Sequence, residues 1–144
     1  MRKSTASVSL GLALLLSGQG CRSEKPADQV RRAFETCRAA VEAGDAGAAT
    51  APLAPAFQGP EGMDKATAHL FLMGTFRHEK VGVTVVRNDV AVRGSEALQE
   101  VELILTGRSG GLLPQEASHR SFLLRWRQSG SEWKLAELQA MDGR

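Results

Sequence analysis

Apolar residues alternate with polar ones through most of the second half of the chain, from residue 81 to residue 137. This alternation predicts strands with one buried face and one solvated face. The runs are separated by turn signals at Asn88-Asp89, Gly94-Ser95 and Ser129-Gly130 and by a longer loop over residues 107–118. Strands with short connections pair antiparallel, because a parallel crossover needs a dozen or more residues. We therefore predict an antiparallel sheet.

The turn at Ser129-Gly130 limits how the last two strands can pair. It predicts a register in which Trp126 faces Trp133 and Phe122 faces Glu137. These four side chains would then lie on the inner face of the sheet. We expect the two indoles to fill the interior and desolvation to raise the pKa of Glu137.

Charged residues occupy the opposite face of the same strands. Glu100 and Glu102 alternate with apolar residues and are therefore predicted to face solvent. Counting through the loop over residues 107–118 pairs Glu102 with Arg125 and Glu100 with Arg127. Opposite charges at such positions contribute a few tenths of a kcal/mol to about 1 kcal/mol.

Helix signals come before the strands. Pro26 suits a first helical turn and Gly44 can end that helix in a left-handed conformation, which predicts a helix over residues 26–43. Asp45 caps a short second helix over residues 46–50. Helices followed by antiparallel strands give an α+β domain, with the helices on one face of the sheet.

A third helix is predicted from about Asp64 to Arg77. Its apolar residues, which include Leu70, Phe71 and Phe76, occupy more than one stripe. A helix that is apolar on several sides is normally surrounded by other elements. We therefore expect this helix to be enclosed.

The first 20 residues have the three parts of a secretory signal. Arg2 and Lys3 precede an apolar stretch over residues 8–16, and small and polar residues lead to Cys21. A mature membrane-spanning helix needs about 20 apolar residues, so this stretch is too short. We divide the chain into a signal peptide (1–20), a tether (21–26) and one domain (27–141), and we expect export.

Cys21 refines that expectation. The run from Leu14 to Cys21, with Gly20 before the cysteine, resembles the lipobox of bacterial lipoproteins, in which the cysteine thiol receives lipid. Gly18 departs from the leucine that is usual three residues before the cysteine. The alternative is ordinary signal cleavage, which Gly18 and Gly20 also permit. With lipid at Cys21, the protein would be held at a membrane of the cell envelope.

The net charge and the second cysteine limit the functions that the domain could have. Of the 18 Lys and Arg residues, Arg2 and Lys3 precede Cys21, which leaves 16 against the 16 Asp and Glu. A neutral domain has no electrostatic footprint for nucleic acid. Cys37 shares a helical stripe with Phe34, so we expect a buried thiol that acts as a small hydrophobe rather than a nucleophile.

Short cues at both ends of the domain resemble nuclear-transport-factor-2-like (SnoaL-like) domains over residues 27–140. The cues are residues 43–45 and 53–57 near the start, and Leu105–Gly107, Phe122–Arg127 and Gly130–Leu135 near the end. Ala56 departs from the pattern, since many such domains have an acidic residue there. The resemblance implies a bent, cone-shaped sheet around a cavity. Its members include isomerases, dehydratases and non-catalytic modules, so the fold does not fix function.

Two side chains are candidates for a cavity of this kind. The resemblance implies that the position of Glu137, two residues past the Trp-x-Leu pair, lines the cavity. His69 lies on one stripe with Leu72 and Phe76 and could face the cavity mouth. Either residue could instead have a structural role, Glu137 in solvent and His69 half-buried with a local hydrogen bond. The chain has no tyrosine, the usual phenolic donor of an isomerase site.

Two functions follow from these candidates. The first is a non-catalytic envelope domain that binds a small apolar ligand or a protein, with Glu137, His69, Phe122, Trp126 and Trp133 around its pocket. The second is an isomerase or dehydratase in which Glu137 and His69 act as acid and base. We expect no cofactor and no metal, because the three histidines lack ligand spacing. A homodimer is a further candidate assembly.

Overall fold

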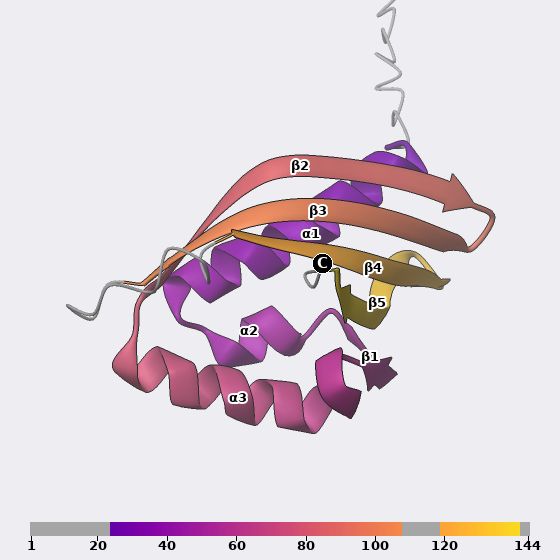
Figure 1. Cartoon of the computed structure of the whole chain (residues 1–144). Helices are drawn as coiled ribbons and strands as arrows, with labels where there is room; N and C mark the ends of the chain where they lie inside the picture. Colours follow the sequence, from indigo (N-terminus) through magenta and orange to yellow (C-terminus); the bar gives the residue numbers. More distant parts are fainter. Residues whose placement is uncertain (1–23, 108–118, 142–144) are drawn as a thin grey trace, which may run out of the picture.

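The structure is a computed structural model that describes residues 24–107 and 119–141. The predicted signal segment 1–20, Cys21 and most of the 107–118 loop lie outside these residues. Three helices and a short 3-10 turn are arranged around one sheet (Figure 1). The elements are α1 (Pro26–Ala43), α2 (Ala46–Thr50), β1 (Leu53–Gln58), η1 (Pro60–Gly62), α3 (Lys65–His78), β2 (Val81–Arg93), β3 (Glu96–Gly107), β4 (His119–Ser129) and β5 (Glu132–Ala140).

Local signals set the limits of the first two helices, whose predicted bounds are confirmed. Pro26 begins α1, and Gly44 ends it with φ 70°, a left-handed conformation that costs glycine little. The Asp45 carboxylate accepts a hydrogen bond from the Ala48 N–H at 2.9 Å and so caps α2. At its far end α1 is bound to β2, because Glu42 Oε1 accepts from the Val83 N–H at 2.9 Å.

The sheet has the strand order β1-β5-β4-β3-β2. The pairs from β2 to β5 are antiparallel, as predicted, and the α+β fold class is confirmed. The segment from Leu53 to Gln58, for which no strand was predicted, forms β1 and pairs parallel with β5, with Leu53 beside Leu135. The sheet is therefore mixed and not purely antiparallel.

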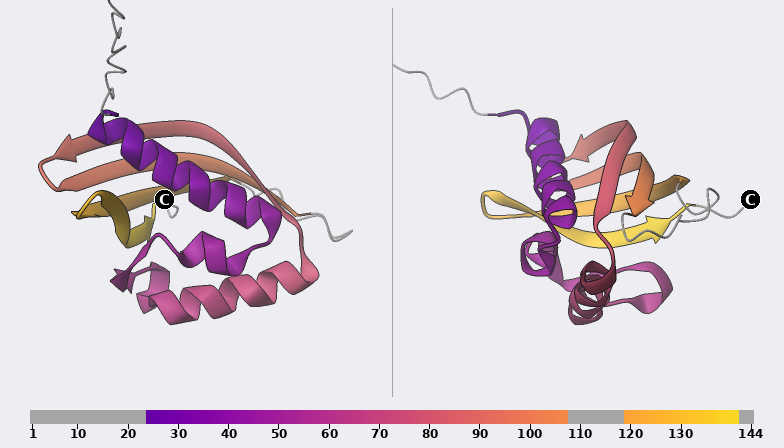
Figure 2. Two further views of the ribbon diagram at one scale, coloured as in Figure 1. Left: turned by 180° about the vertical axis from the view of Figure 1, so that it is seen from behind. Right: turned by 90° about the vertical axis from the view of Figure 1, so that its left-hand side faces the viewer.

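The helix α1 crosses the inner face of the curved sheet (Figures 1 and 2) and encloses the core. Three side chains in this core are almost completely buried: Trp126, Gln99 and Val30. The core is built by residues from α1, β1, α3 and the four long strands: Val30, Phe34, Leu53, Phe57, Ala68, Val83, Ala97, Val101, Leu103, Leu124, Trp126, Trp133 and Leu135.

The predicted turn at Asn88-Asp89 is wrong. The strand β2 continues through both residues to Arg93, with an irregularity between Val85 and Arg87. The Asn88 side chain does not close a turn, because its Oδ1 accepts a hydrogen bond from Gln99 Nε2 on β3 at 2.7 Å. The chain reverses instead after Arg93, where Gly94 has φ 58°.

The predicted register of the last hairpin is also wrong. Ser129 pairs with Glu132, so the turn residues are Gly130, with φ 63°, and the residue after it. This shift by two positions puts Trp126 opposite Leu135 instead of opposite Trp133. Both indoles are still on the buried side of the sheet.

A bulge in β5 changes the register again. Leu135 pairs with Trp126 but Glu137 pairs with Arg125, so Ala136 is an extra residue on the β5 side. Because side chains alternate between faces, one extra residue moves Glu137 to the outer face. The predicted pairing of Phe122 with Glu137 is replaced by Phe122 with Ala140.

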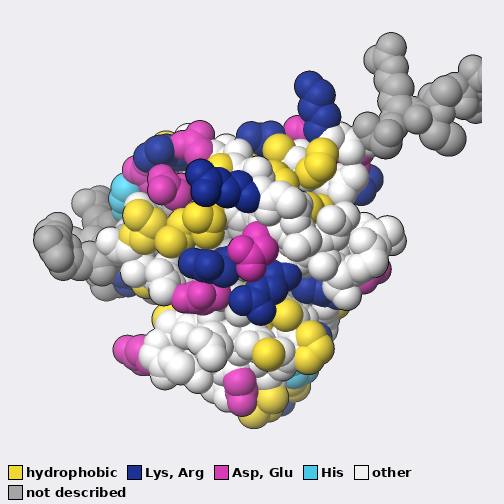
Figure 3. Space-filling view, turned by 90° about the vertical axis from the view of Figure 1, so that its right-hand side faces the viewer, with side chains coloured by type: hydrophobic (Ala, Val, Ile, Leu, Met, Phe, Trp, Pro, Cys, Tyr) yellow, Lys and Arg dark blue, Asp and Glu magenta, His cyan; other side chains and the backbone are white. Residues whose placement is uncertain are grey.

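The outer face has the acidic residues predicted there, but with different partners. Arg127 is opposite Glu96, and their Nε and Oε1 atoms are 3.6 Å apart. Glu100 Oε2 lies 3.4 Å from Arg87 Nη2 on β2. The pairs Glu102–Arg125 and Glu100–Arg127 are therefore wrong, because the register of β3 with β4 differs by four residues from the one predicted, with Arg125 opposite Leu98. On the face shown in Figure 3, Lys and Arg side chains are interspersed with Asp and Glu.

The helix α3 lies at the lower edge of the molecule in Figure 1 and packs against α2 and β1. Asp64 caps it by accepting from the Thr67 N–H at 2.7 Å. Its far side has no neighbouring element among the described residues, and Leu70 and Phe71 are 67% and 59% exposed. The prediction of an enclosed helix is therefore wrong. None of the described helices is long and apolar enough to cross a bilayer.

Candidate functional site

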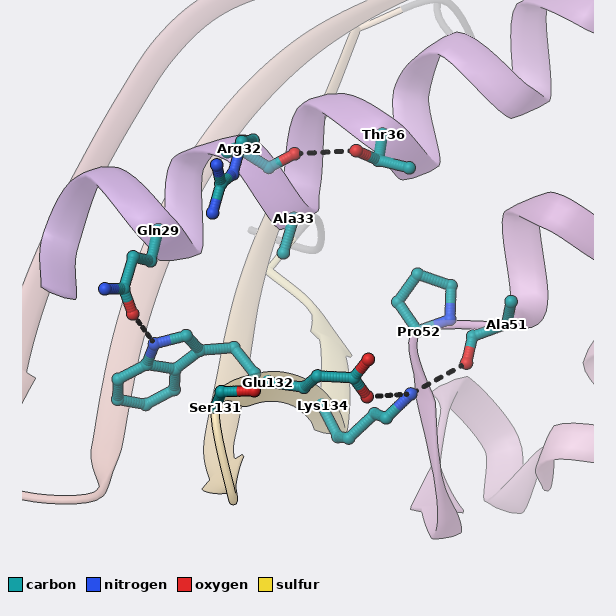
Figure 4. A pocket seen from close by; sticks show the side chains of 10 residues that line it. Gln29, Arg32, Ala33, Thr36, Ala51, Pro52, Ser131, Glu132 and Lys134 are labelled. Carbon is teal, nitrogen blue, oxygen red and sulfur yellow. Dashed lines mark hydrogen bonds and ion pairs between the residues drawn. The ribbon is translucent and has the colours of Figure 1, made fainter. Parts of the chain in front are cut away.

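A groove of about 300 Å³ lies between α1 and the start of β5. We call it the α1–β5 groove (Figure 4). It is bordered by the first half of α1, the α2–β1 connection and the β4–β5 turn. The residues that line it are Gln29, Arg32, Ala33, Thr36, Ala51, Pro52, Ser131, Glu132, Trp133 and Lys134.

Trp133 forms the wall of this groove and is held by α1. The side chain is 5% exposed, and its Nε1–H donates to Gln29 Oε1 at 3.0 Å. Gln29 Nε2 in turn donates to the Glu24 carbonyl at 2.9 Å. The neighbour of the Trp133 indole is thus Gln29 of α1 and not Trp126, the predicted partner. This chain of hydrogen bonds connects the N-terminal end of α1 with the sheet.

The rim of the groove is charged on both sides. Arg32 Nη2 lies 2.8 Å from Glu24 Oε2 on the α1 side. Lys134 Nζ lies 3.3 Å from Glu132 Oε2 and 3.5 Å from the Ala51 carbonyl on the other side (Figure 4). Both cations are partly exposed and could contact a polar group of a bound molecule. Because their partners are solvent-accessible carboxylates, an anion could replace those partners at little cost.

Few side chains in this groove can act as an acid or a base. The described lining residues include no His, Cys or Asp. The one carboxylate in the lining, Glu132, has a 70% exposed side chain and an ion pair with Lys134. A general base needs a defined position beside the reacting proton and a pKa near the working pH. This geometry favours binding over proton transfer.

Behind the groove, the interior of the sheet holds a polar network instead of an acid. Trp126 Nε1–H donates to Gln99 Oε1 at 2.8 Å, and Gln99 Nε2 donates to Asn88 Oδ1 at 2.7 Å. Trp126 and Gln99 are both 0% exposed. A buried amide with partners for its oxygen and its nitrogen costs little, whereas an unpaired one costs about 1–3 kcal/mol. The network therefore specifies how β2, β3 and β4 align.

Glu137 lies away from this interior. Its Oε2 is 3.5 Å from Arg125 Nε, and its Oε1 accepts from Gln139 Nε2 at 2.6 Å, both on the outer face. It borders a second hollow, of about 700 Å³, between the end of β5 and the η1 turn. The α1–β5 groove does not include Glu137.

His69 belongs to the helical layer. Its Nδ1 lies 3.2 Å from Thr50 Oγ1 on α2. The Thr50 hydroxyl also donates to the Ala46 carbonyl at 2.8 Å, which fixes it within α2. His69 therefore connects α3 with α2, while Glu137 pairs with Arg125. The structure does not bring the two predicted acid–base residues together.

The other predicted pocket residues are separated as well. Trp133 lines the α1–β5 groove, Trp126 is in the core, and Phe122 packs against that core from β4. Gln29 and Gln99 were missed. Gln99 could have been found, because it extends the inward series Leu103 and Val101 by one step of two residues. Gln29 has no comparable signal, since its partner is more than a hundred residues away.

No group of three or more His, Cys, Asp or Glu side chains in residues 24–107 and 119–141 is arranged to hold a metal ion. Burial raises the pKa of the Cys37 thiol to about 11, which keeps it protonated at neutral pH. A protonated thiol is a poor nucleophile.

Solved structures share this arrangement. An NTF2-like protein from Cytophaga hutchinsonii superimposes with a TM-score of 0.65 at 14% identity, over 81% of this chain and 98% of its own. A proposed dehydratase of the NTF2-like family from Streptomyces avermitilis gives a TM-score of 0.68 at 18% identity, over 79% and 93% of the two chains. The chain has an NTF2-like fold.

Other comparisons limit what can be inferred from this similarity. Bd1075 of Bdellovibrio bacteriovorus gives a TM-score of 0.68 at 12% identity, over 81% of this chain but 41% of the larger protein. No family model and no curated protein matches the sequence. At these identities the NTF2-like likeness concerns the fold, which is shared by binding proteins and enzymes.

Proposed function

We propose that this chain is an exported, lipid-anchored protein of the bacterial cell envelope whose NTF2-like domain binds a small molecule without catalysing its conversion. The binding site is the α1–β5 groove. Its apolar wall at Trp133 and its polar rim at Arg32 and Lys134 suit a largely apolar molecule with one anionic or strongly polar end.

The observation that supports binding over catalysis is the separation of Glu137 from His69. A dehydratase or isomerase of the predicted kind needs acid and base on the two sides of one substrate. Here Glu137 is paired with Arg125 on the outer face and His69 with Thr50 in the helical layer. The polar interior is an amide–indole network, and neither group acts as an acid or a base at neutral pH.

The anchoring part of the proposal rests on the signal segment and on Cys21. In a bacterial host, the full chain should label with an alkyne fatty acid and sediment with membranes. Cys21→Ser should abolish the label and either release the protein or leave the precursor uncleaved. Cys37→Ser is the matched control and should label like the parent. Equal labelling of Cys21→Ser and the parent would overturn the anchor.

The binding part can be tested at the groove itself. The full chain, purified from membranes, is analysed by mass spectrometry for co-purifying small molecules. Ser131→Trp, at the groove edge, should reduce the recovered molecule at least tenfold by filling the space. Ser95→Trp, in the exposed turn between β2 and β3, is the control and should leave recovery unchanged. Equal recovery from both variants, or no bound molecule in the parent, would contradict this assignment.

A further inference from the structure

The solvent side of α3 forms a continuous apolar surface, which we call the α3 face. Leu70 is 67% exposed, Phe71 59% and Met73 37%. From residue 66 to residue 76 the helix has no Asp, Glu, Lys or Arg. His69 within this stretch turns toward Thr50 on α2. Three turns of uncharged helix therefore meet water, which is unusual unless another surface covers them.

Small residues on both sides of Leu70 give this face a shape suited to another helix. Ala66 and Gly74 are one turn before and one turn after Leu70, on the same stripe of the helix. A Cβ added at Gly74 would have no neighbour within 4 Å. Small residues on such a stripe let a second helix backbone approach closely. The face thus has a large central side chain with a shallow space at each end.

Charges stand at the two ends of the α3 face and have opposite signs. Glu61 and Asp64 precede the helix, and hydrogen bonds from Thr67 lower the pKa of Asp64, which keeps it ionised. Arg77 and His78 form the last turn. These four residues form no ion pair within the described part of the chain.

The one other charge in the helix points inward. Lys65 Nζ donates to the Leu53 carbonyl at 3.0 Å and so faces β1. The exposed side of α3 is therefore acidic at its start, apolar along its length and basic at its end. A second helix that runs in the opposite direction has the complementary order.

We propose that two copies of this chain pair through their α3 faces, antiparallel, around a twofold axis at Leu70. In this arrangement Ala66 of each copy meets Gly74 of the other, and the two Leu70 side chains touch at the axis. The acidic start of each helix then meets Arg77 and His78 of the second copy. The two helix dipoles oppose each other, which is also favourable.

The outer face of the sheet, over the residues that the structure describes, lacks this self-complementarity. The outer face of the sheet has an exposed Leu98, but ion-paired side chains such as Glu96 and Arg127 stand next to it. One helix pair buries less than the roughly 1,200 Å² of a standard interface, so we expect a weak, micromolar dimer. This inference does not depend on a lipid anchor or on a ligand in the α1–β5 groove.

Disulfide cross-linking of the full chain in intact cells tests the twofold axis. Leu70→Cys should give a disulfide-linked dimer on oxidation, because residues on the axis meet their own copies. Leu98→Cys, comparably apolar and exposed on the sheet, is the matched control. The parent chain, which keeps Cys21 and Cys37, sets the background. We expect at least a fivefold excess of dimer from Leu70→Cys over both.

A charge exchange tests the direction of the helices. Arg77→Glu in the Leu70→Cys background should reduce the cross-linked fraction severalfold, and adding Glu61→Arg should restore it. The proposal is overturned by a Leu70→Cys yield at background, by more dimer from Leu98→Cys, or by a double variant no better than Arg77→Glu alone. Fatty-acid labelling of the same samples separates these outcomes from failure of the anchor.

Discussion

The helices α1 and α3 are of similar size but are stabilised in different ways. α1 buries a narrow apolar stripe that includes Val30 and Phe34, and it has ion pairs such as Arg31–Asp28 on its solvent side. α3 has large apolar residues on both sides, and only Ala68 is buried. α1 is therefore complete within one chain, whereas α3 has apolar surface that one chain leaves uncovered.

The difference shows how much the periodicity of apolar residues reveals about the position of a helix. A strong 3.6-residue period, as in α1, identifies the direction of the core. Apolar residues without that period, as in α3, indicate that several sides need cover but do not identify the covering element. The expectation that α3 would be enclosed within its own domain added an assumption that its sequence does not contain.

The largest contrast is expected between two phenylalanines. Phe34 in α1 is 7% exposed and Phe71 in α3 is 59% exposed. Phe34→Ala should lower the free energy of unfolding by about 3–5 kcal/mol through lost burial and a cavity. Phe71→Ala should change it by less than about 0.5 kcal/mol in dilute solution. Urea unfolding measures both, and similar losses from the two variants would mean that α3 is more buried than described.

Two glycines give a smaller contrast of opposite sign. Gly44 ends α1 with φ 70°, where alanine is strained, so Gly44→Ala should cost about 1–2 kcal/mol. Gly74 lies inside α3 with open space around it, and Gly74→Ala should stabilise the monomer by about 0.5–1 kcal/mol. Thermal unfolding at low concentration checks both signs. A destabilising Gly74→Ala would show that another surface already occupies that space.

The smallest effect is a pH dependence in α1. Burial raises the pKa of Cys37 from 9.0 to about 11, so the neutral thiol stabilises the fold below pH 9 and that stability is lost as pH rises through 11. The loss should be roughly 0.8 kcal/mol by pH 9.5. Urea unfolding measures it as the difference in the free energy of unfolding between the parent and Cys37→Ala, which should change by this amount as the pH rises.

A cysteine on α3 is the control for this measurement. Met73→Cys, in the Cys37→Ala background, places a thiol on a surface that is 37% exposed at present. It should react with iodoacetamide at pH 8.5 much faster than Cys37 does in the parent. Equal rates would show that the environments of the two helices are alike, contrary to the comparison.

The sequence predicted those parts of the fold that depend on neighbouring residues. The bounds of α1 and α2 follow from Pro26, Gly44 and Asp45, whose effects act within one turn of helix. The antiparallel strands follow from alternation. Strand β1 and the continuity of β2 through Asn88 did not follow, because β5 and Gln99 stabilise them from distant parts of the chain.

The candidate site was harder to predict because register decides it. Trp133 was correctly expected on the buried side, but its neighbour is Gln29 of α1 and not Trp126. Glu137 was expected inside, and the bulge at Ala136 moved it outside. Neither the two-residue shift in the hairpin nor the bulge has a signature in the local sequence, since both reflect how the whole sheet bends.

The bulge in β5 also indicates how such a domain could change its chemistry over evolution. If Ala136 took a regular place in the ladder opposite Arg125, the bulge would vanish and Glu137 would move opposite Leu124, from the outer surface to the interior side of the sheet. A carboxylate would then enter a protected space without any substitution of a side chain. In a fold that is shared by binding proteins and enzymes, a shift of strand register by one residue can thus be a shorter route between the two than a series of point mutations.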